Sequence, residues 1–276
     1  MLRDHALSYL LAGIYTVEGL AEHAVFKGGT ALRKCYFTDY RYSEDLDFST
    51  RDLHTWTTGE LTELIDAACM AAQALAEVIG APYTFTARAE KHRTDRTDTQ
   101  HNFRVTVVFP TGATLPIKFE LTQIEPIVTP LETRALIHAF EGETLDIELP
   151  TYSLDEVVLE KLRAFLQTAV NMDRRNWTNR SRDLYDLWWL WNQNVPVLWN
   201  QLREPLAAKA AARDVTFSGP EDFLDSRVLR AYRDGWDIRL ANVVPALPAF
   251  DDALLALRNV LARVFATESP PLANLD

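Results

Sequence analysis

Cysteine is scarce in this sequence, whose 276 residues include only Cys35 and Cys69. Two cysteines without ligand spacing indicate neither a disulfide framework nor a cysteine-based zinc site, so we expect both thiols to be reduced. The six histidines are scattered without ligand spacing, and the sequence assigns them no role.

Long apolar runs are also missing. No stretch approaches the roughly 18 consecutive apolar residues that a membrane-spanning helix needs. The N-terminal segment carries acidic residues and a histidine where a signal peptide needs a clean apolar stretch. We therefore expect a cytoplasmic protein without membrane contact.

Basic residues are outnumbered. The chain has 28 Lys and Arg against 39 Asp and Glu, which gives a formal net charge of −11. Proteins that bind nucleic acid through phosphates are usually basic, so this balance counts against a general nucleic-acid binder. It leaves room for an enzyme that touches one RNA end through a local patch.

The patterning predicts an α+β protein with two lobes. Before residue 150, helices are expected at 5–24, from Thr30 onward and at 58–79. Alternating segments predict a mixed, antiparallel-leaning sheet, and its strands are expected in “AVFKGG”, “YSEDLDFS”, “YTFTARAE”, “NFRVTVVFP”, “LPIKFELT” and “LDIELP”. We place a domain boundary near residue 150, with a sheet-containing domain at 1–150 and a helical domain at 151–276.

Two carboxylates stand one residue apart in “YSEDLDFS”. Alternate side chains of a strand share a face, so Ser43, Asp45 and Asp47 are expected on one side and Leu46 and Phe48 on the other. Paired carboxylates raise each other's pKa, and a divalent cation relieves the repulsion. Mg²⁺, held by a few carboxylates and substrate phosphates, suits this pattern.

A third acid is a candidate for the same site. Glu120 in “LPIKFELT” shares a strand face with Lys118, and it completes a carboxylate triad if that strand pairs beside “DLDF”. Upstream, we expect Lys27, Gly28, Gly29 and Thr30 to form a strand-to-helix turn. Together with Ser43 they are candidates for binding the triphosphate of a nucleotide. Glycines there let backbone N–H groups approach a triphosphate, although an ordinary turn has the same pattern.

Charged residues interrupt the apolar stripes of two later helices. Lys161 lies on the core-facing stripe of “SLDEVVLEKLRAFLQTAV”, Asp183 lies within that of “RSRDLYDLWWLWNQ”, and Asp186 lies at its edge. Lys161 and Asp183 either form a buried structural ion pair or serve the substrate, with the lysine on its phosphates. We expect Arg163 to point to solvent.

A basic patch separates these two helices. It consists of Arg174, Arg175, Arg180 and Arg182. The patch is either a solvated loop or the local contact for a nucleic-acid backbone.

Four motifs, in order, resemble one known family. “FKGGTALRK” with “RYSEDLDF” closely resembles the opening motif of the AbiEii-type nucleotidyltransferase toxins, members of the DNA polymerase β-like nucleotidyltransferase superfamily. “IKFEL” resembles their next acidic strand, and “LDEVVLEKLRAF” and “SRDLYDLWW” resemble their late lysine and aspartate motifs. The resemblance runs from about residue 20 to 192.

The resemblance implies an activity. It implies a two-lobed enzyme in which a nucleotidyltransferase core domain at 1–150 and a helical domain at 151–276 form the active site between them. It also implies Mg²⁺-dependent transfer of a nucleotide from an NTP, often a pyrimidine one, onto the 3′ end of tRNA, which blocks translation, and a partner antitoxin. By motif, Asp45 and Asp47 hold the metal and activate the attacking hydroxyl, Lys161 contacts the phosphates and Asp183 completes the site. Ser43 resembles a position that is phosphorylated in some relatives to switch the toxin off.

Two other hypotheses stay open from the sequence. One keeps the fold and changes the acceptor to a small molecule or a protein hydroxyl. The other is a silent relative that binds a nucleotide or a partner. The basic patch favours RNA, whereas the charge of −11 is awkward for a tRNA-binding toxin.

Overall fold

The computed structural model of the chain describes residues 2–90, 99–172 and 179–266. It divides into two compact units. The sheet unit comprises Met1–Ile127 and Leu131–Tyr152, and the helical unit comprises Val128–Pro130 and Ser153–Asp276. A three-residue segment inside the predicted first domain thus belongs with the helices.

The sheet unit is built on one mixed sheet. Among the described residues its seven strands run in the order β3-β4-β5-β2-β1-β7-β6. β2 pairs antiparallel with β1 and parallel with β5. The strands are β1 (Ala24–Lys27), β2 (Leu46–Thr50), β3 (Thr84–Glu90), β4 (Gln100–Val108), β5 (Thr114–Thr122), β6 (Glu132–Ala135) and β7 (Glu148–Thr151).

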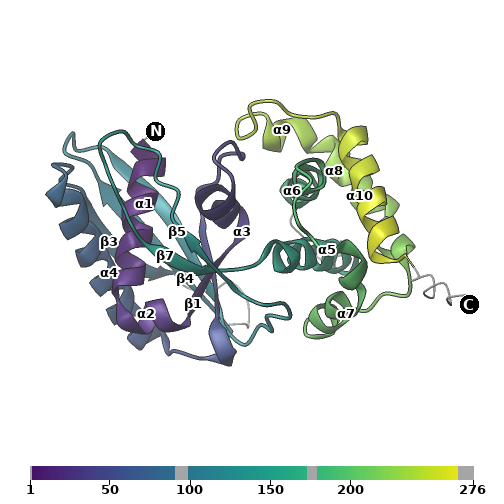
Figure 1. Ribbon diagram of the computed structural model, residues 1–276, viewed down its shortest axis with the longest axis horizontal. Coiled ribbons are helices and arrows are strands. Elements are labelled where there is room, and N and C mark those ends of the chain that lie inside the picture. Colours follow the sequence, from purple (N-terminus) through teal and green to yellow (C-terminus); the bar gives the residue numbers. More distant parts are fainter. Residues whose placement is uncertain (1, 91–98, 173–178, 267–276) are drawn as a thin grey trace, which may run out of the picture. The chain divides into compact units, whose positions relative to one another are not determined.

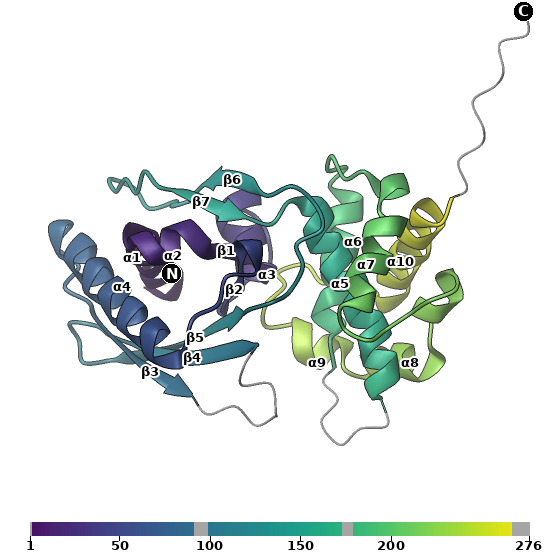
Figure 2. The ribbon, with the colours of Figure 1, turned by 90° about the horizontal axis from the view of Figure 1, so that it is seen from below.

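The first helix is the centre of this unit. The sheet curls around α1 (Leu2–Thr16), and α4 (Thr58–Val78) lies beside it (Figures 1 and 2). Every residue of α1 from His5 to Ile14 is buried, as expected for a helix that is apolar on all sides. A Cβ at Gly13 would lie 2.3 Å from the Ala68 carbonyl oxygen, so the lack of a side chain lets the two helices touch.

The boundaries of α4 follow from its sequence. Thr57 and Glu60 form a reciprocal capping box at its N-terminus. Its stripe of Leu61, Ile65 and small residues faces the core. Beyond its C-terminus Gly80 has φ +77°, a conformation that favours glycine. The predicted helix at 58–79 is confirmed.

Two predicted elements differ in the structure. The helix expected at 5–24 is α1 followed by α2 (Glu18–His23), with a break at Val17. The strand expected from Tyr42 begins only at Leu46. Ser43 and Asp45 therefore precede the strand, and strand alternation does not position them.

The helical unit centres on α5, which has α6 on one side and α7 on the other (Figures 1 and 2). Ser153 caps α5 by accepting a hydrogen bond from the Glu156 amide. The longer helices are α5 (Leu154–Asn171), α6 (Ser181–Asn192), α7 (Arg203–Ala211), α8 (Ser226–Asp234), α9 (Trp236–Leu240) and α10 (Phe250–Val264).

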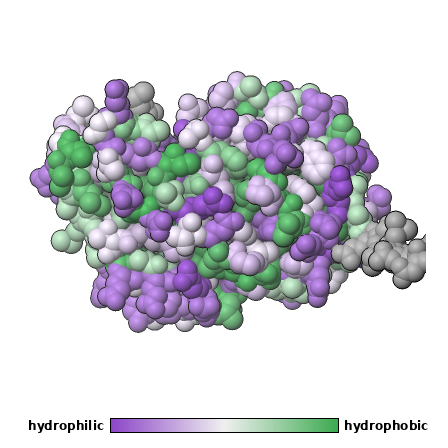
Figure 3. All heavy atoms as spheres, viewed as in Figure 1, coloured by the Kyte–Doolittle hydropathy of each residue, from purple (hydrophilic) through white to green (hydrophobic). Residues whose placement is uncertain are grey.

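The surface mixes residue types. On the face drawn in Figure 3, hydrophobic residues form small separate groups among hydrophilic ones. Over the part of the chain that the structure describes, no helix is long and apolar enough to cross a membrane.

Candidate active site

Gly28 and Asp47 meet at the ends of two paired strands. Lys27 is the register partner of Asp47 in the antiparallel β1–β2 pair, and Gly28 follows directly with φ +80°. A Cβ built on Gly28 would lie 2.5 Å from Asp47 Oδ2. Glycine is required here twice, by the backbone conformation and by the carboxylate against it.

The next glycine lies under an arginine and a serine. A Cβ on Gly29 would lie 2.6 Å from Arg41 Nη2 and 3.1 Å from Ser43 Oγ. Arg41 is buried, with 3% of its surface exposed. Sequence reasoning missed Arg41, although it stands two residues before Ser43 in the same motif.

Thr30 orders the segment that precedes β2. Its hydroxyl lies 2.9 Å from Ser43 Oγ and donates to the Asp45 carbonyl oxygen at 2.5 Å. These contacts tie the turn at Gly28 to the segment that carries Ser43 and Asp45. Hydrogen bonds from Thr30, and not strand alternation as the sequence predicted, therefore position Ser43 and Asp45.

Glu120 joins the first two carboxylates, as the sequence predicted. The parallel pairing of β2 with β5 makes Asp47 and Glu120 register partners, so both side chains leave the same face of the sheet. Burial, and after it the charges of Glu120 and Asp45, raise the pKa of Asp47 to about 7. Asp45 and Glu120 thus both act electrostatically on Asp47.

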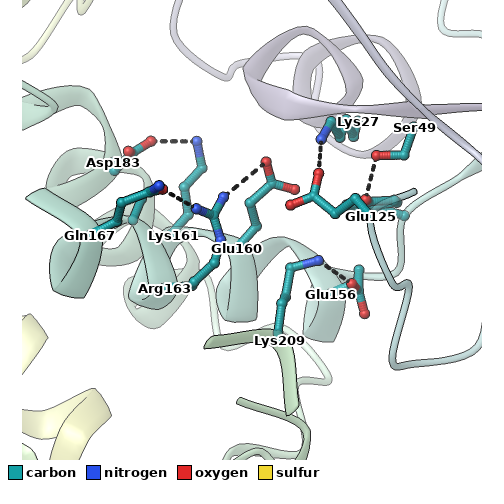
Figure 4. Close-up of polar contacts among 12 residues, drawn as sticks. Lys27, Ser49, Glu125, Glu156, Glu160, Lys161, Arg163, Gln167, Asp183 and Lys209 are labelled. Carbon is teal, nitrogen blue, oxygen red and sulfur yellow. Dashed lines mark hydrogen bonds and ion pairs between the residues drawn. The ribbon is translucent and has the colours of Figure 1, made fainter. Parts of the chain in front are cut away.

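Two lysines balance this negative charge. Lys118 Nζ lies 2.6 Å from Glu120 Oε2, and the pKa of Lys118 is raised by Glu120, Asp47 and Asp45 against the opposing effect of burial. Lys27 Nζ lies 3.0 Å from Glu125 Oε2, and both side chains are buried (Figure 4). Lys27, predicted to bind the nucleotide, is thus held by an internal carboxylate.

The carboxylates are not packed as tightly as a closed metal cage. Among the His, Cys, Asp and Glu side chains of the described residues, only His5, His138 and Glu143 form a group of three whose ligand atoms all lie within 4.8 Å of one another. The ligand atoms of Asp45, Asp47 and Glu120 therefore do not all lie that close together. Mg²⁺ usually takes one or two carboxylates and completes its shell with waters and substrate phosphates. Asp45 and Asp47 beside the Gly28–Gly29 turn fit that open type of site.

Lys161 contacts two aspartates in the helical unit. Its Nζ lies 2.6 Å from Asp183 Oδ1 (Figure 4). The same nitrogen lies 3.0 Å from Asp186 Oδ2. Asp186 is fully buried, whereas the side chains of Lys161 and Asp183 are 12% and 10% exposed. The ion pair that the sequence offered as one alternative is present, and both of its members keep some exposed surface.

A second lysine–carboxylate pair was not predicted. Lys209 Nζ lies 2.6 Å from Glu156 Oε1, and both side chains are fully buried (Figure 4). The other carboxylate oxygen accepts hydrogen bonds from the amides of Val128 and Thr129. This pair binds the segment Val128–Pro130 to the helical unit.

The arginines around α6 differ in their surroundings. Arg180 and Arg182 are exposed, and Arg180 Nη1 lies 3.8 Å from Asp183 Oδ2. Arg174 and Arg175 lie outside the described residues. Arg163, expected in solvent, is buried and bonds Gln167. Helix α5 packs against both α6 and α7, so more of its surface is buried than its hydrophobic stripe predicts.

A family match covers most of the chain that carries this glycine turn, these carboxylates and the paired Lys161. The profile of the family “Nucleotidyl transferase AbiEii toxin, Type IV TA system” matches residues 9–256. The chain belongs to the AbiEii family. This AbiEii protein is therefore a nucleotidyltransferase toxin of a type IV toxin–antitoxin system, with a nucleotide as substrate and an antitoxin as partner.

A solved structure supports the fold of this AbiEii protein. MenT4, a nucleotidyltransferase toxin from Mycobacterium tuberculosis, superposes with a TM-score of 0.61 and 21% sequence identity. The match covers 97% of this chain and 84% of that chain, and at this identity it shows the fold alone. The α+β nucleotidyltransferase fold expected from the sequence is confirmed. Comparison with curated protein sequences gives no significant match.

Proposed function

We propose that this AbiEii protein uses Mg²⁺ to transfer a nucleotide from an NTP to an RNA, with the 3′ end of tRNA as the acceptor, and so blocks translation. One observation carries the proposal. The carboxylate of Asp47 lies directly against Gly28, in electrostatic contact with Asp45 and Glu120, at a turn that a phosphate can approach.

The chemistry needs positioning more than covalent participation. The acceptor hydroxyl attacks the α-phosphorus, a new P–O bond forms, and pyrophosphate leaves from the opposite side. Bound Mg²⁺ would supply neutralisation of the phosphate charge. Asp45, Asp47 and Glu120 would hold it, with Asp45 and Asp47 nearest the glycine turn.

The same carboxylate cluster can take up the proton that the hydroxyl loses. In the metal-free protein the pKa of Asp47 is about 7. Bound Mg²⁺ would lower this pKa and so keep the carboxylate ionised, as a proton acceptor must be. Lys118, at 2.6 Å from Glu120, keeps the cluster from carrying its full negative charge. Gly28 leaves room for the Asp47 carboxylate and Gly29 leaves room for Arg41 and Ser43, so these side chains can lie beside a bound triphosphate. Thr30 orders the turn through its contacts with Ser43 and the Asp45 carbonyl oxygen.

Arg41 extends this nucleotide site. Its guanidinium lies over Gly29 beside Ser43, and a buried, permanently charged fork of donors suits phosphate oxygens. A phosphate on Ser43 would occupy that same position. We therefore propose that Arg41 binds the triphosphate and that modification of Ser43 blocks it.

Lys161 and Asp183 are proposed to serve the same reaction. Lys161 is shared between Asp183 and Asp186, so a phosphate that binds the lysine would replace one of two carboxylates. Asp186 keeps the lysine oriented while this exchange takes place. Asp183, at the start of α6, would orient the group that completes the site.

Two features of the charge distribution bear on the identity of the acceptor, and they point in different directions. Arg180 and Arg182 are exposed and can meet a phosphate backbone, and Arg174 and Arg175 belong to the same basic segment. The net charge of −11 favours a second candidate, in which the acceptor is a small molecule or a protein hydroxyl.

One experiment separates these possibilities. The purified protein is incubated with Mg²⁺, each α-labelled NTP in turn and total tRNA, beside Asp45→Asn, Lys161→Ala and the control Asp39→Asn. Asp39 is an exposed acid of the same segment. We expect label on tRNA that both site variants lose and the control keeps.

Other outcomes revise the proposal in a defined way. Label on the protein or on a small molecule would retain nucleotidyl transfer and replace the acceptor. Label on tRNA that survives Asp45→Asn would remove the carboxylate cluster from the reaction. No label anywhere, with no Mg²⁺-dependent NTP binding by calorimetry, would leave a silent binding protein.

A further inference from the structure

Two histidines and a glutamate converge inside the sheet unit, apart from the carboxylates already described. His5 Nε2 lies 2.7 Å from Glu143 Oε2, and His138 Nε2 lies 3.0 Å from the same oxygen. The three ligand atoms all lie within 4.8 Å of one another. We propose that His5, His138 and Glu143 bind a zinc ion that fastens the segment between β6 and β7 to helix α1.

The donor set suits zinc. Two imidazole nitrogens with one carboxylate oxygen are ligands that Zn²⁺ takes, with a fourth position left to water. Zinc–ligand bonds of about 2.0–2.2 Å place tetrahedral ligand atoms about 3.3 Å apart. The two nitrogen–oxygen separations of 2.7 and 3.0 Å need to open by a few tenths of an ångström. The two histidine nitrogens, which lie within 4.8 Å of each other, need to move to the same spacing.

The surroundings hold the ligands in place. The side chains of His5 and His138 are 9% and 2% exposed, and Glu143, at 21%, gives the cluster its access to solvent. Tyr83 Oη lies 2.9 Å from His5 Nδ1 and can accept its proton, which frees Nε2 for a metal. Tyr9, one helical turn after His5, donates to Glu143 Oε2 at 2.9 Å.

The cluster joins segments far apart in sequence. His5 belongs to α1, whereas His138 and Glu143 belong to the irregular segment between β6 and β7. Two backbone hydrogen bonds hold the base of that segment, from Leu136 N to Ile147 O and from Ile137 N to Lys34 O. Leu145 and Ile147 also pack against the core. A metal there would link its outer part to the central helix, which indicates a structural site.

Zinc binding to the full-length protein tests the proposal. Chelator-treated protein is titrated with Zn²⁺ in competition with a chromophoric chelator, with millimolar Mg²⁺ present to fill other carboxylate sites. We expect one Zn²⁺ per chain, at least about tenfold weaker binding in Glu143→Gln and His138→Ala, and a melting temperature raised by about 5 °C under saturating Zn²⁺.

Two controls keep the test specific. Glu141→Gln changes an exposed acid of the same segment. His54→Gln removes a member of the stacked His23–His54 pair, whose ring centroids are 3.8 Å apart. Both should bind like the unaltered protein. Glu143→Gln keeps the shape of the side chain, so it decides the matter if His138→Ala fails to fold.

The proposal is overturned if Glu143→Gln binds Zn²⁺ with unchanged affinity and stoichiometry, or if the unaltered protein takes up none beside Mg²⁺. Loss of binding in His54→Gln would instead assign the ion to the His23–His54 pair and likewise overturn it. None of these outcomes depends on nucleotidyl transfer.

Discussion

Asp47 is the residue whose surroundings oppose its own charge. In the unfolded chain its pKa is near the ordinary 3.8, and in the folded protein it is about 7. A folded-state pKa above the unfolded value means that the folded protein binds the proton more tightly. Metal-free protein should therefore lose stability from this group as the pH rises from about 4 to about 7.

Asp47→Asn removes this penalty. With EDTA present, urea unfolding at pH 8 should show the variant more stable by roughly 1 to 3 kcal/mol, and the difference should vanish toward pH 4. Nucleotidyl transfer should be lost at the same time. Asp39→Asn, an exposed acid, should change neither quantity. A variant less stable than the unaltered protein at pH 8 would contradict the assigned charge cluster.

Gly28 permits a different test at the same position. Gly28→Ala should lower nucleotidyl transfer by about 100-fold or more, because the new methyl group displaces the Asp47 carboxylate now 2.5 Å away. Gly80 is the matched control, since it also has positive φ, +77°, but nothing lies within 4 Å of the position that its Cβ would take.

Rates and urea unfolding of the two glycine variants separate site damage from backbone strain. Both should lose about 1 to 2 kcal/mol of stability from the left-handed backbone. Equal activity in both would show that Gly28 matters only for its conformation.

For single residues, the sequence predicted which side chains belong to the candidate site better than it predicted the contacts that position them. The Asp-x-Asp pattern and Glu120 were readable because charged residues interrupted apolar strands. Arg41 was not, since its role depends on the path of the segment between Tyr36 and Leu46, which no periodicity encodes. The cluster of His5, His138 and Glu143 was invisible because more than half the chain's sheet unit separates its members.

Among the elements, the contact between α1 and α4 depends on one missing side chain. Gly13→Ala would push a methyl group to 2.3 Å from the Ala68 carbonyl oxygen, so the helices must separate. We expect a loss of about 1 to 3 kcal/mol in urea unfolding. Gly59 lies in α4, but the nearest atom to its Cβ position is Thr57 Oγ1, 3.9 Å away. Gly59→Ala should therefore be neutral or slightly stabilising. Similar losses in both would argue against a tight α1–α4 contact.

Variants of the two lysine–carboxylate pairs in the helical unit can distinguish a structural role from a role in the reaction. Lys161→Met leaves the fully buried Asp186 uncompensated and should cost about 3 to 5 kcal/mol. Adding Asp186→Asn should recover most of that stability without recovering transfer. Chemical unfolding and activity per folded molecule give the two readouts.

Lys209→Met is the matched control, since it breaks the buried pair with Glu156. It should destabilise the protein by a similar amount while leaving activity per folded molecule nearly unchanged. Full activity in Lys161→Met/Asp186→Asn would assign Lys161 a purely structural role.

Local signals predicted the elements well where they were strong. The helix predicted at 58–79 matches α4, whose ends are set by the Thr57–Glu60 capping box and Gly80, and alternation predicted β3, β4 and β5. The break at Val17 was missed because apolar residues continue through it. β6 was missed because its four residues, half of them charged, show no apolar alternation, and its existence depends on pairing with β7.

For the whole molecule, the charge of −11 makes the acceptor testable by salt. If tRNA is held by a local basic patch, Arg180→Glu with Arg182→Glu should weaken tRNA labelling and flatten its dependence on salt, by about 0.7 in the log–log slope for each single-strand phosphate that is no longer neutralised. NTP binding should not change. The matched charge reversal Arg258→Glu, on exposed surface of α10, should leave the slope unaltered.

An unchanged slope in the double variant would remove RNA-backbone contact from that patch. The small-molecule or protein acceptor would then become the better candidate.

The chain enters the helical unit twice, first with Val128–Pro130 and again from Ser153, and it returns to the sheet unit in between. This has a consequence for synthesis on the ribosome. Glu156, which holds the amides of Val128 and Thr129, is itself neutralised by Lys209, a residue translated several seconds later at ordinary elongation rates. Until then the crossover has no settled anchor. Nascent chains stalled before α7 should therefore yield a protease-sensitive crossover, and those stalled well past it a protected one.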